Sequence, residues 1–362
     1  MPGQVCLTYH PLYNGRGFSP VRPSWQRYRM ALELFHRLDL DAAARTVQPP
    51  LADPDDLLAV HPPQYVEYVR QRAAEGHGYL DRRDTPAWPG LFERALAAVG
   101  ATLAAVRLIG EGQACHVFNP GGGLHHAHRD RTSGFCIFND VVLAVRWLQR
   151  DYGFRRVAIV DIDGHHGDGV QELLYDEPVL TISFHQYDGR FFPRTGSVDE
   201  VGWGAGFGLN VNVTLPAYAG DGPFATAFEQ VVPRALRAYR PEVLLVNFGV
   251  DGHYSDPLVR LRLSTGAYRL VATWMHQLAH ELCDGRLIAL GSGGYHPQHA
   301  ARCWAVLLAI LAGRLPAGND AWPADLSLLA DSGVPPADPA AAARVQAVLR
   351  HLVERVLPLR LA

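Results

Sequence analysis

The sequence predicts an α/β protein, a single domain in which helices cover both faces of a parallel sheet. Several short apolar runs have the length and composition of buried strands. Stretches with the helical spacing of apolar side chains separate many of these runs, and strands that alternate with helices are typical of parallel sheets. Each run also ends near glycine or a polar residue. In such sheets the functional residues gather beyond the carboxyl ends of the strands.

The predicted elements follow one another without an internal repeat. We expect strands at His116–Asn119, Arg156–Asp161, Val179–Phe184, Leu209–Val213, Glu242–Phe248 and Arg286–Leu290. We expect helices at Ala95–Ile109, Asn139–Gln149, Pro223–Tyr239 and Thr265–Cys283.

The last part of the chain has a different composition. Residues 314–339 are rich in proline, alanine and aspartate and show weak periodicity. Asp338-Pro339 then has the pattern of a helix start, and the apolar residues that follow share one face: Val345, Val348, Leu349, Leu352 and Val356. We therefore predict a main domain over residues 1–313, with residues 314–362 as a connection and a C-terminal helix packed on it. A helix that binds a partner is the alternative.

Composition and charge exclude several classes of protein. The 362 residues are 48% hydrophobic, enough for a large core, so global disorder is excluded. The net charge of −3 gives no electrostatic basis for binding nucleic acid or an acidic membrane surface. The best apolar run, Cys303–Ala312, is much shorter than the roughly 20 residues of a membrane span. We expect neither nucleic acid nor a membrane as a partner.

Cysteine and lysine usage narrows the chemistry further. The five cysteines are widely spread, odd in number and form no C-x-x-C motif, which indicates reduced thiols and a cytoplasmic location. The chain contains no lysine. Schiff-base catalysis, pyridoxal-phosphate chemistry and P-loop nucleotide hydrolysis all use a lysine, so they are excluded.

Polar residues crowd behind four of the predicted strands. In chain order these segments are Gly121–His126, Asp161–Asp168, Gly249–His253 and Gly291–Tyr295. Because the carboxyl ends of parallel strands meet at one edge of the sheet, we expect the four segments to lie together. Histidine, aspartate and tyrosine at four strand ends indicate a functional site.

Asp163, His165 and Asp251 form a candidate metal site. Asp163 and His165 lie two residues apart, which in an extended chain places both side chains on one face. A carboxylate that only orients the histidine gives the same pattern. Asp251 follows another buried strand and would supply a third ligand. Two carboxylates and one imidazole neutralise a divalent ion and leave a position open, which suits catalytic zinc or iron(II).

His125 and His126 allow two interpretations. An isolated pair would be ordinary loop histidines. Here Asp161 and Asp168 flank the ligand motif as two further carboxylates, and each could orient one imidazole and raise its basicity.

Three aromatic residues also allow two interpretations. Tyr295 follows a glycine-rich turn, where it either packs beside the strand end or stabilises an oxyanion opposite the metal. Phe135 and Phe192 are either packing residues or the walls of a narrow apolar channel for a thin alkyl chain.

Five motifs in order carry a family resemblance: GGGLHHAHRDRTSGFCIFND, VDIDGHHGDG, SFHQYDGRFFPRTG, FGVDGHYSDP and GSGGYHPQHAARCW. From about Cys6 to Gly313 the chain resembles the histone deacetylase superfamily, particularly the bacterial acetoin-utilisation type. The resemblance implies the arginase/deacetylase fold and a zinc-dependent amidohydrolase that removes the acetyl group from an N-acetyl-amine.

The resemblance also implies a role for each candidate residue. The zinc ligands would be Asp163, His165 and Asp251. His126 would act as general base and acid and His125 as its electrostatic partner, with Asp168 and Asp161 paired to them. Tyr295 would bind the carbonyl oxygen.

The same resemblance extends to substrate and cation binding. Gly134, Phe135 and Phe192 would line the channel, and Asp84 would hold a peptide backbone at the rim. Arg27 would lie in a pocket under the metal. Ser183 and Phe184 would bind a structural monovalent cation such as K⁺ through main-chain oxygens.

Three residues depart from the family pattern. Gly164 stands where a larger residue is usual, Ser292 interrupts the glycine run before Tyr295, and Arg194 occupies a position that is commonly glycine. None of these changes removes a catalytic group. Arg194 bears on substrate preference, with an acidic residue beside the acetyl-lysine as one expectation.

The sequence favours acetyl-lysine in proteins or peptides as the substrate. Family members that hydrolyse acetylpolyamines carry a long early insertion, whereas the stretch from His61 to His116 has room only for a compact helix and the Asp84 loop. Small acetylated amines remain the alternative. An arginase-like enzyme would need a second set of carboxylates, but Gly167 and His253 stand at those positions. A non-catalytic acetyl-lysine reader would be expected to lose Tyr295 or a ligand.

Overall fold

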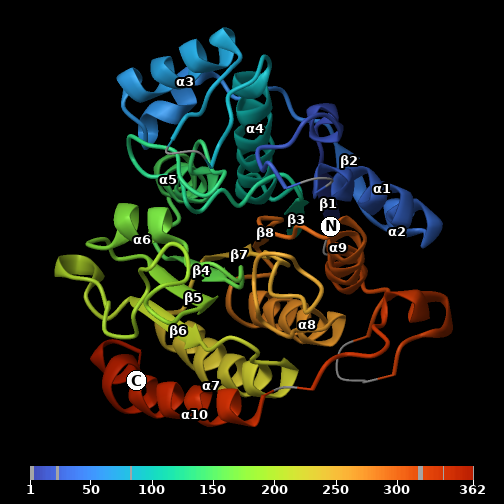
Figure 1. Cartoon of the computed structure of the whole chain (residues 1–362), viewed down its shortest axis with the longest axis vertical. Helices are drawn as coiled ribbons and strands as arrows, with labels where there is room; N and C mark the ends of the chain where they lie inside the picture. Colours follow the sequence, from blue (N-terminus) through green and yellow to red (C-terminus); the bar gives the residue numbers. More distant parts are fainter. Residues whose placement is uncertain (1–3, 22–23, 82–83, 317–320, 337, 362) are drawn as a thin grey trace.

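A parallel sheet of eight strands runs between two layers of helices (Figure 1). The computed structural model describes residues 4–21, 24–81, 84–316, 321–336 and 338–361. The strands are β1 (Val5–Thr8), β2 (Arg45–Val47), β3 (His116–Asn119), β4 (Val157–Asp161), β5 (Leu180–Gln186), β6 (Asn210–Leu215), β7 (Val243–Asn247) and β8 (Leu287–Leu290). Their order is β2-β1-β3-β8-β7-β4-β5-β6, and all neighbours are parallel.

The helices divide between the two faces of the sheet. One core contains residues of α3 (Pro63–Glu75), α4 (Leu91–Gly110), α5 (Asp140–Tyr152) and α6 (Asp168–Leu174). The other contains residues of α1 (Arg27–Arg37), α2 (Leu40–Ala43), α7 (Asp221–Tyr239), α8 (Thr265–Leu282), α9 (Pro297–Leu311) and α10 (Pro339–His351). Shorter helical turns are η1 (Pro11–Asn14), η2 (Ser24–Gln26), η3 (Pro54–Ala59), η4 (Gly204–Gly206), η5 (Ala324–Leu329), η6 (Leu352–Val356) and η7 (Leu357–Leu359). Among the described helices, none is long and apolar enough to cross a membrane.

Strand β4 shows why the sheet needs cover on both sides. Val157 and Ile159 belong to one core, and Ala158 and Val160 belong to the other. Successive strand side chains point to opposite faces, so a run that is apolar throughout buries apolar surface in both directions.

The predicted fold class is confirmed. The six expected strands are all present, with ends that differ by at most two residues, and the four expected helices correspond to α4, α5, α7 and α8. The strands β1 and β2 and the helices α1, α2, α3, α6 and α9 were not predicted. The stretch from His61 to His116 therefore holds two helices around the Asp84 loop rather than one.

The C-terminal helix α10 lies against α7 and β6 (Figure 1). Val345, Leu349, Leu352 and Val356 are buried in the same core as α7, whereas Val348 is half-buried. The expected apolar face is thus covered by the chain's own fold, beside the edge strand β6.

The order of the strands decides where the polar segments meet. β3, β8, β7 and β4 are consecutive in the sheet, although β8 comes last in the chain. Their carboxyl ends are therefore neighbours, and the four polar segments of the sequence follow these four strands.

Candidate active site

The three predicted metal ligands converge behind β4 and β7. One donor atom from each of Asp163, His165 and Asp251 lies within 4.8 Å of the others, and all three residues are buried. His165 Nδ1 is 2.8 Å from Asp251 Oδ2 and 3.2 Å from Asp163 Oδ1. Burial disfavours charge on the imidazole, but the two carboxylates outweigh burial and raise the pKa of His165 to about 10. Two buried carboxylates facing one imidazole fit a divalent cation.

Glycines and backbone donors hold these carboxylates in place. The Gly293 N–H donates to Asp163 Oδ2 at 2.8 Å, and the Gly164 N–H donates to Asp251 Oδ1 at 2.6 Å. A Cβ at Gly293 would lie 2.4 Å from Asp163 Oδ2 and 2.5 Å from Asp251 Oδ2. Only glycine leaves room for both carboxylates at this point.

His125 and His126 each pair with one aspartate, and the two pairs have the same length. His125 Nδ1 is 2.7 Å from Asp161 Oδ2, and His126 Nδ1 is 2.7 Å from Asp168 Oδ1. Burial disfavours charge on His125, but Asp161 and Asp163 outweigh it and raise the pKa of this histidine to about 9. Burial lowers the pKa of His126 to about 4, and the neighbouring His125 acts in the same direction. The first imidazole is therefore charged at neutral pH and the second is a free base.

Tyr295 stands at the end of the polar segment that follows β8. Its backbone N–H donates to Asp256 Oδ2 at 2.7 Å, which fixes the turn. Burial and the nearby carboxylates of Asp251 and Asp163 raise the pKa of Tyr295 well above its ordinary value. The hydroxyl thus stays protonated and is available as a hydrogen-bond donor.

Comparison with known proteins agrees with this geometry. The histone deacetylase domain family matches residues 22–311. The chain belongs to the histone deacetylase family.

Similar proteins come from bacteria and an archaeon. The chain is 37% identical over 310 residues to the acetoin utilization protein AcuC of Bacillus subtilis, which covers 82% of this chain and 80% of the relative. It is 33% identical over 279 residues to the protein of the same name from Staphylococcus aureus, covering 75% and 71%. It is also 33% identical over 302 residues to a protein of Archaeoglobus fulgidus named "Probable deacetylase", covering 81% and 82%. The protein is thus a hydrolytic deacetylase of this family.

The deacetylase has an entrance cavity of about 380 Å³ that leads to the predicted ligand His165. It is lined by the expected residues Asp84, His126, Gly134, Phe135, Phe192 and Tyr295, and by three residues that were not predicted: Arg190, Phe191 and Leu258.

Aromatic and glycine residues shape the walls of this cavity. The Phe192 ring lies 5.0 Å from that of His126, and the Phe191 ring stacks on that of His165 at 5.1 Å. Gly134 has φ +52°, and a Cβ there would lie 2.5 Å from His126 Cδ2, so glycine lets the wall approach the histidine. No sequence pattern distinguished Phe191 from its neighbour Phe192.

Asp84 is exposed at the rim of the entrance cavity. The Asp81 carboxylate accepts hydrogen bonds from the Asp84 and Thr85 N–H groups, at 2.7 and 3.0 Å. Burial, together with the nearby Asp81, raises the pKa of Asp84. The Asp81 carboxylate thus holds the backbone at Asp84, whose own carboxyl group lies at the rim.

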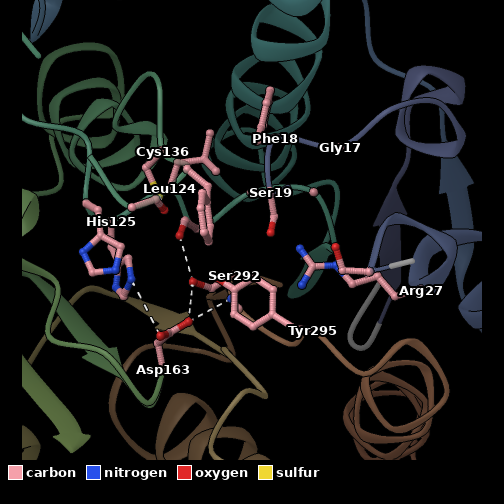
Figure 2. A pocket seen from close by; sticks show the side chains of 18 of the residues that line it. Gly17, Phe18, Ser19, Arg27, Leu124, His125, Cys136, Asp163, Ser292 and Tyr295 are labelled. Carbon is pink, nitrogen blue, oxygen red and sulfur yellow. Dashed lines mark hydrogen bonds and ion pairs between the residues drawn. The ribbon is translucent and has the colours of Figure 1, made fainter. Parts of the chain in front are cut away.

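A second, inner cavity of about 60 Å³ shares His126, Gly134, Phe135 and Tyr295 with the entrance cavity (Figure 2). Asp163, His125, Ser292 and Tyr295 line it, together with the expected Arg27. The Arg27 guanidinium donates to the Gly294 carbonyl at 2.6 Å. Figure 2 shows Asp163 facing both His125 and Ser292.

The structure explains two of the three departures from the family pattern. A Cβ at Gly164 would lie 2.6 Å from the side chain of Val259, which occupies the space of a larger residue. Ser292 Oγ lies 3.0 Å from Asp163 Oδ2 and 2.9 Å from the Gly123 carbonyl, so its hydroxyl helps to hold the predicted ligand. Arg194 is exposed and does not line the entrance cavity, where Arg190 lies instead.

His128 is a further residue that the sequence analysis missed. Its Nε2 lies 3.3 Å from Asp168 Oδ2, and its Nδ1 lies 2.8 Å from Glu172 Oε2. His128 therefore fixes Asp168 from the side opposite His126. In the sequence, only the position of His128 close to His125 and His126 could have indicated this role.

Proposed function

We propose that this enzyme is a zinc-dependent deacetylase that hydrolyses the amide of N-acetyl-lysine in proteins or peptides. One arrangement carries the proposal: His126 and Tyr295 line both cavities, and the cluster of Asp163, His165 and Asp251 reaches the inner cavity through Asp163 and the entrance cavity through His165. Asp163, His165 and Asp251 would hold a divalent ion, which would polarise the acetyl carbonyl and acidify the attacking water. Zinc suits one imidazole and two carboxylates, and iron(II) suits the same donors.

The residues of the chain supply the proton transfers. His126, neutral at pH 7, accepts the proton of the attacking water and later returns it to the leaving amine. His125, held in its charged form by Asp161 and Asp163, stabilises the negative charge that develops. Tyr295 donates a hydrogen bond to the acetyl carbonyl oxygen, where that negative charge develops.

The inner cavity has a positively charged residue in its wall, which suits the acetate product. Acetate is an anion, and the guanidinium of Arg27 is a permanent cation in the wall of that cavity. We therefore assign the cavity to the acetyl methyl group and to acetate after cleavage.

The entrance favours a peptide over a small cationic amine. Asp84 can accept hydrogen bonds from two consecutive backbone N–H groups of an extended peptide. The guanidinium of Arg190 lines the same entrance and repels the ammonium groups of a polyamine. The Asp84 carboxylate would attract those groups, which keeps small acetylated amines as the second candidate.

The remaining assignments rest on the same framework. We propose residues 1–313 as the deacetylase catalytic domain and residues 314–362 as a connection and helix packed on it. We also propose a K⁺ ion at Ser183 and Phe184, where Ser183 and Asp161 line a small cavity. The five free cysteines suit a cytoplasmic enzyme.

A steady-state comparison tests the proposed substrate. kcat/KM is measured on zinc-loaded enzyme for acetyl-lysine peptides, a minimal acetyl-lysine analogue, acetylputrescine and acetylspermidine. We expect the highest kcat/KM for the peptides, and chelation should abolish turnover of every substrate. A higher kcat/KM for the polyamines would overturn the protein substrate and leave the catalytic residues in place.

A further inference from the structure

Three histidines meet at the end of the sheet opposite the active site. His116 is the first residue of β3, whereas the catalytic segments follow the carboxyl ends of the strands. His276 and His280 lie four residues apart in the second half of α8, which places both side chains on one face of the helix. His116 is buried, His276 is half-buried and His280 is exposed.

The three rings form a nearly equilateral triangle. Their centroids lie 4.9 Å apart for His116 and His276, 5.0 Å for His116 and His280, and 4.7 Å for His276 and His280. The two Nε2 atoms of His116 and His280 are 3.1 Å apart. One nitrogen from each ring lies within 4.8 Å of the others.

These spacings match three imidazoles around one tetrahedral ion. Zinc–nitrogen bonds of about 2.0–2.1 Å at tetrahedral angles place ligand nitrogens about 3.3 Å apart and ring centroids about 5 Å apart. A set of side-chain hydrogen bonds explains the triangle less well. His276 Nδ1 is buried and finds no hydrogen-bond partner among the described residues, and one contact between two rings leaves the third unused.

The turn after α8 holds His280 in this position. Gly285 has φ +79°, and a Cβ there would lie 2.9 Å from His280 Cε1. The Gly285 N–H donates to the Ala279 carbonyl at 2.9 Å, so the backbone returns directly over the ring. Glycine at this point lets the turn close against His280.

We propose that His116, His276 and His280 form a second, structural zinc site. Three neutral imidazoles are suitable ligands for zinc, and the exposed position of His280 lets water complete the coordination. The bound ion ties the start of β3 to the second half of α8. This site is separate from the catalytic cluster, whose ligands come from the other end of the sheet.

Zinc titration of metal-free protein tests the proposal, with a chromophoric chelator as competitor. The wild type should bind two zinc ions per chain. Asp163→Asn/Asp251→Asn, which removes two catalytic ligands, should bind one. Adding His276→Ala/His280→Ala should abolish this remaining site. His77→Ala, at an exposed histidine after α3, is the matched control and should change nothing.

Two readouts separate a built site from surface binding. Cobalt(II) in Asp163→Asn/Asp251→Asn should give the visible absorption of a tetrahedral ion, and adding His276→Ala/His280→Ala to this variant should remove that absorption. One equivalent of zinc should raise the melting temperature of Asp163→Asn/Asp251→Asn and should not raise that of the variant that carries all four substitutions. His280→Ala alone should keep deacetylase kcat within about twofold of the wild type.

The proposal is overturned by either of two results. In one, Asp163→Asn/Asp251→Asn binds no zinc at micromolar concentrations. In the other, the stoichiometry, the cobalt spectrum and the thermal shift of Asp163→Asn/Asp251→Asn survive the addition of His276→Ala/His280→Ala, which would mean adventitious binding elsewhere.

Discussion

The active site contains two His–Asp pairs, the inner pair His125–Asp161 and the outer pair His126–Asp168. The two pairs are alike in sequence and geometry but differ in the charge of the histidine. The histidines are consecutive in the chain, and in each pair the histidine Nδ1 lies 2.7 Å from a carboxylate oxygen of the aspartate. The pKa of the inner histidine is about 9, whereas that of the outer histidine is about 4. A paired carboxylate therefore does not by itself decide whether a histidine is charged.

The difference comes from the neighbours beyond each pair. His125 Nε2 lies 3.8 Å from a second carboxylate oxygen, Asp163 Oδ1. His126 has the cationic His125 ring at 4.1 Å, and the Phe192 ring covers its other side. The inner residue is suited to stabilise negative charge and the outer residue to accept a proton. Four predictions test this division.

The largest effect should follow loss of the outer histidine. His126→Ala removes the group that moves the proton, so kcat should fall about 1,000- to 10,000-fold. His125→Ala should lower kcat less, because the proton acceptor remains. Metal content measured on both variants controls for a disturbed site. A larger loss in His125→Ala than in His126→Ala would reverse the assignment of the two residues.

The next largest effect should follow loss of the Tyr295 hydroxyl, the expected hydrogen-bond donor to the oxyanion. Tyr295→Phe removes one hydrogen bond to the developing oxyanion, so kcat should fall about 100- to 1,000-fold, or roughly 3–4 kcal/mol. Metal content and melting temperature should stay unchanged. Near-normal turnover would place Tyr295 in packing, and the charged His125 would then be the chain's main stabiliser of the oxyanion.

The pH profile should separate the pairs most directly. Activity should rise with pH as His126 loses its proton, through a pKa of about 4, and fall again as His125 loses its charge, through about 9. Asp161→Asn removes a carboxylate that raises the pKa of His125. We expect the descending limb to move toward neutral pH, with kcat about 10- to 100-fold lower.

Asp168→Asn is the matched control for that profile. Asp168 raises the pKa of His126, so its loss should move the ascending limb to lower pH and leave the descending limb in place. Identical shifts in the two variants would show that the pairs titrate as one unit.

The smallest effect should appear at the rim, outside both pairs. Asp84→Asn weakens hydrogen bonds to a peptide backbone at an exposed position, so kcat/KM for peptides should fall about tenfold, or ~1.4 kcal/mol. A minimal acetyl-lysine analogue without flanking amides should be affected less. Equal losses for both substrates would remove Asp84 from peptide recognition.

The sequence determined the composition of the site because strand ends and ligand motifs are local. Asp163 and His165 lie in one motif, and the apolar runs that precede each polar segment indicated the strands. A parallel sheet then requires those segments to share an edge, so the candidate set followed without coordinates. Six of the eight strands were predicted. Of these, β3 begins at the predicted residue and the other five begin one residue later.

Tertiary structure decided what depends on residues far apart in the chain. Strand β2 has only three residues, two of them exposed, too few to show a pattern, and it gains stability by pairing with β1. The role of Ser292 depends on a carboxylate 129 residues away, and the meeting of His116 with His280 spans 164 residues. The charges of His125 and His126 were decided in the same way. A pKa depends on burial and on every nearby charge, and neither is a property of the local sequence.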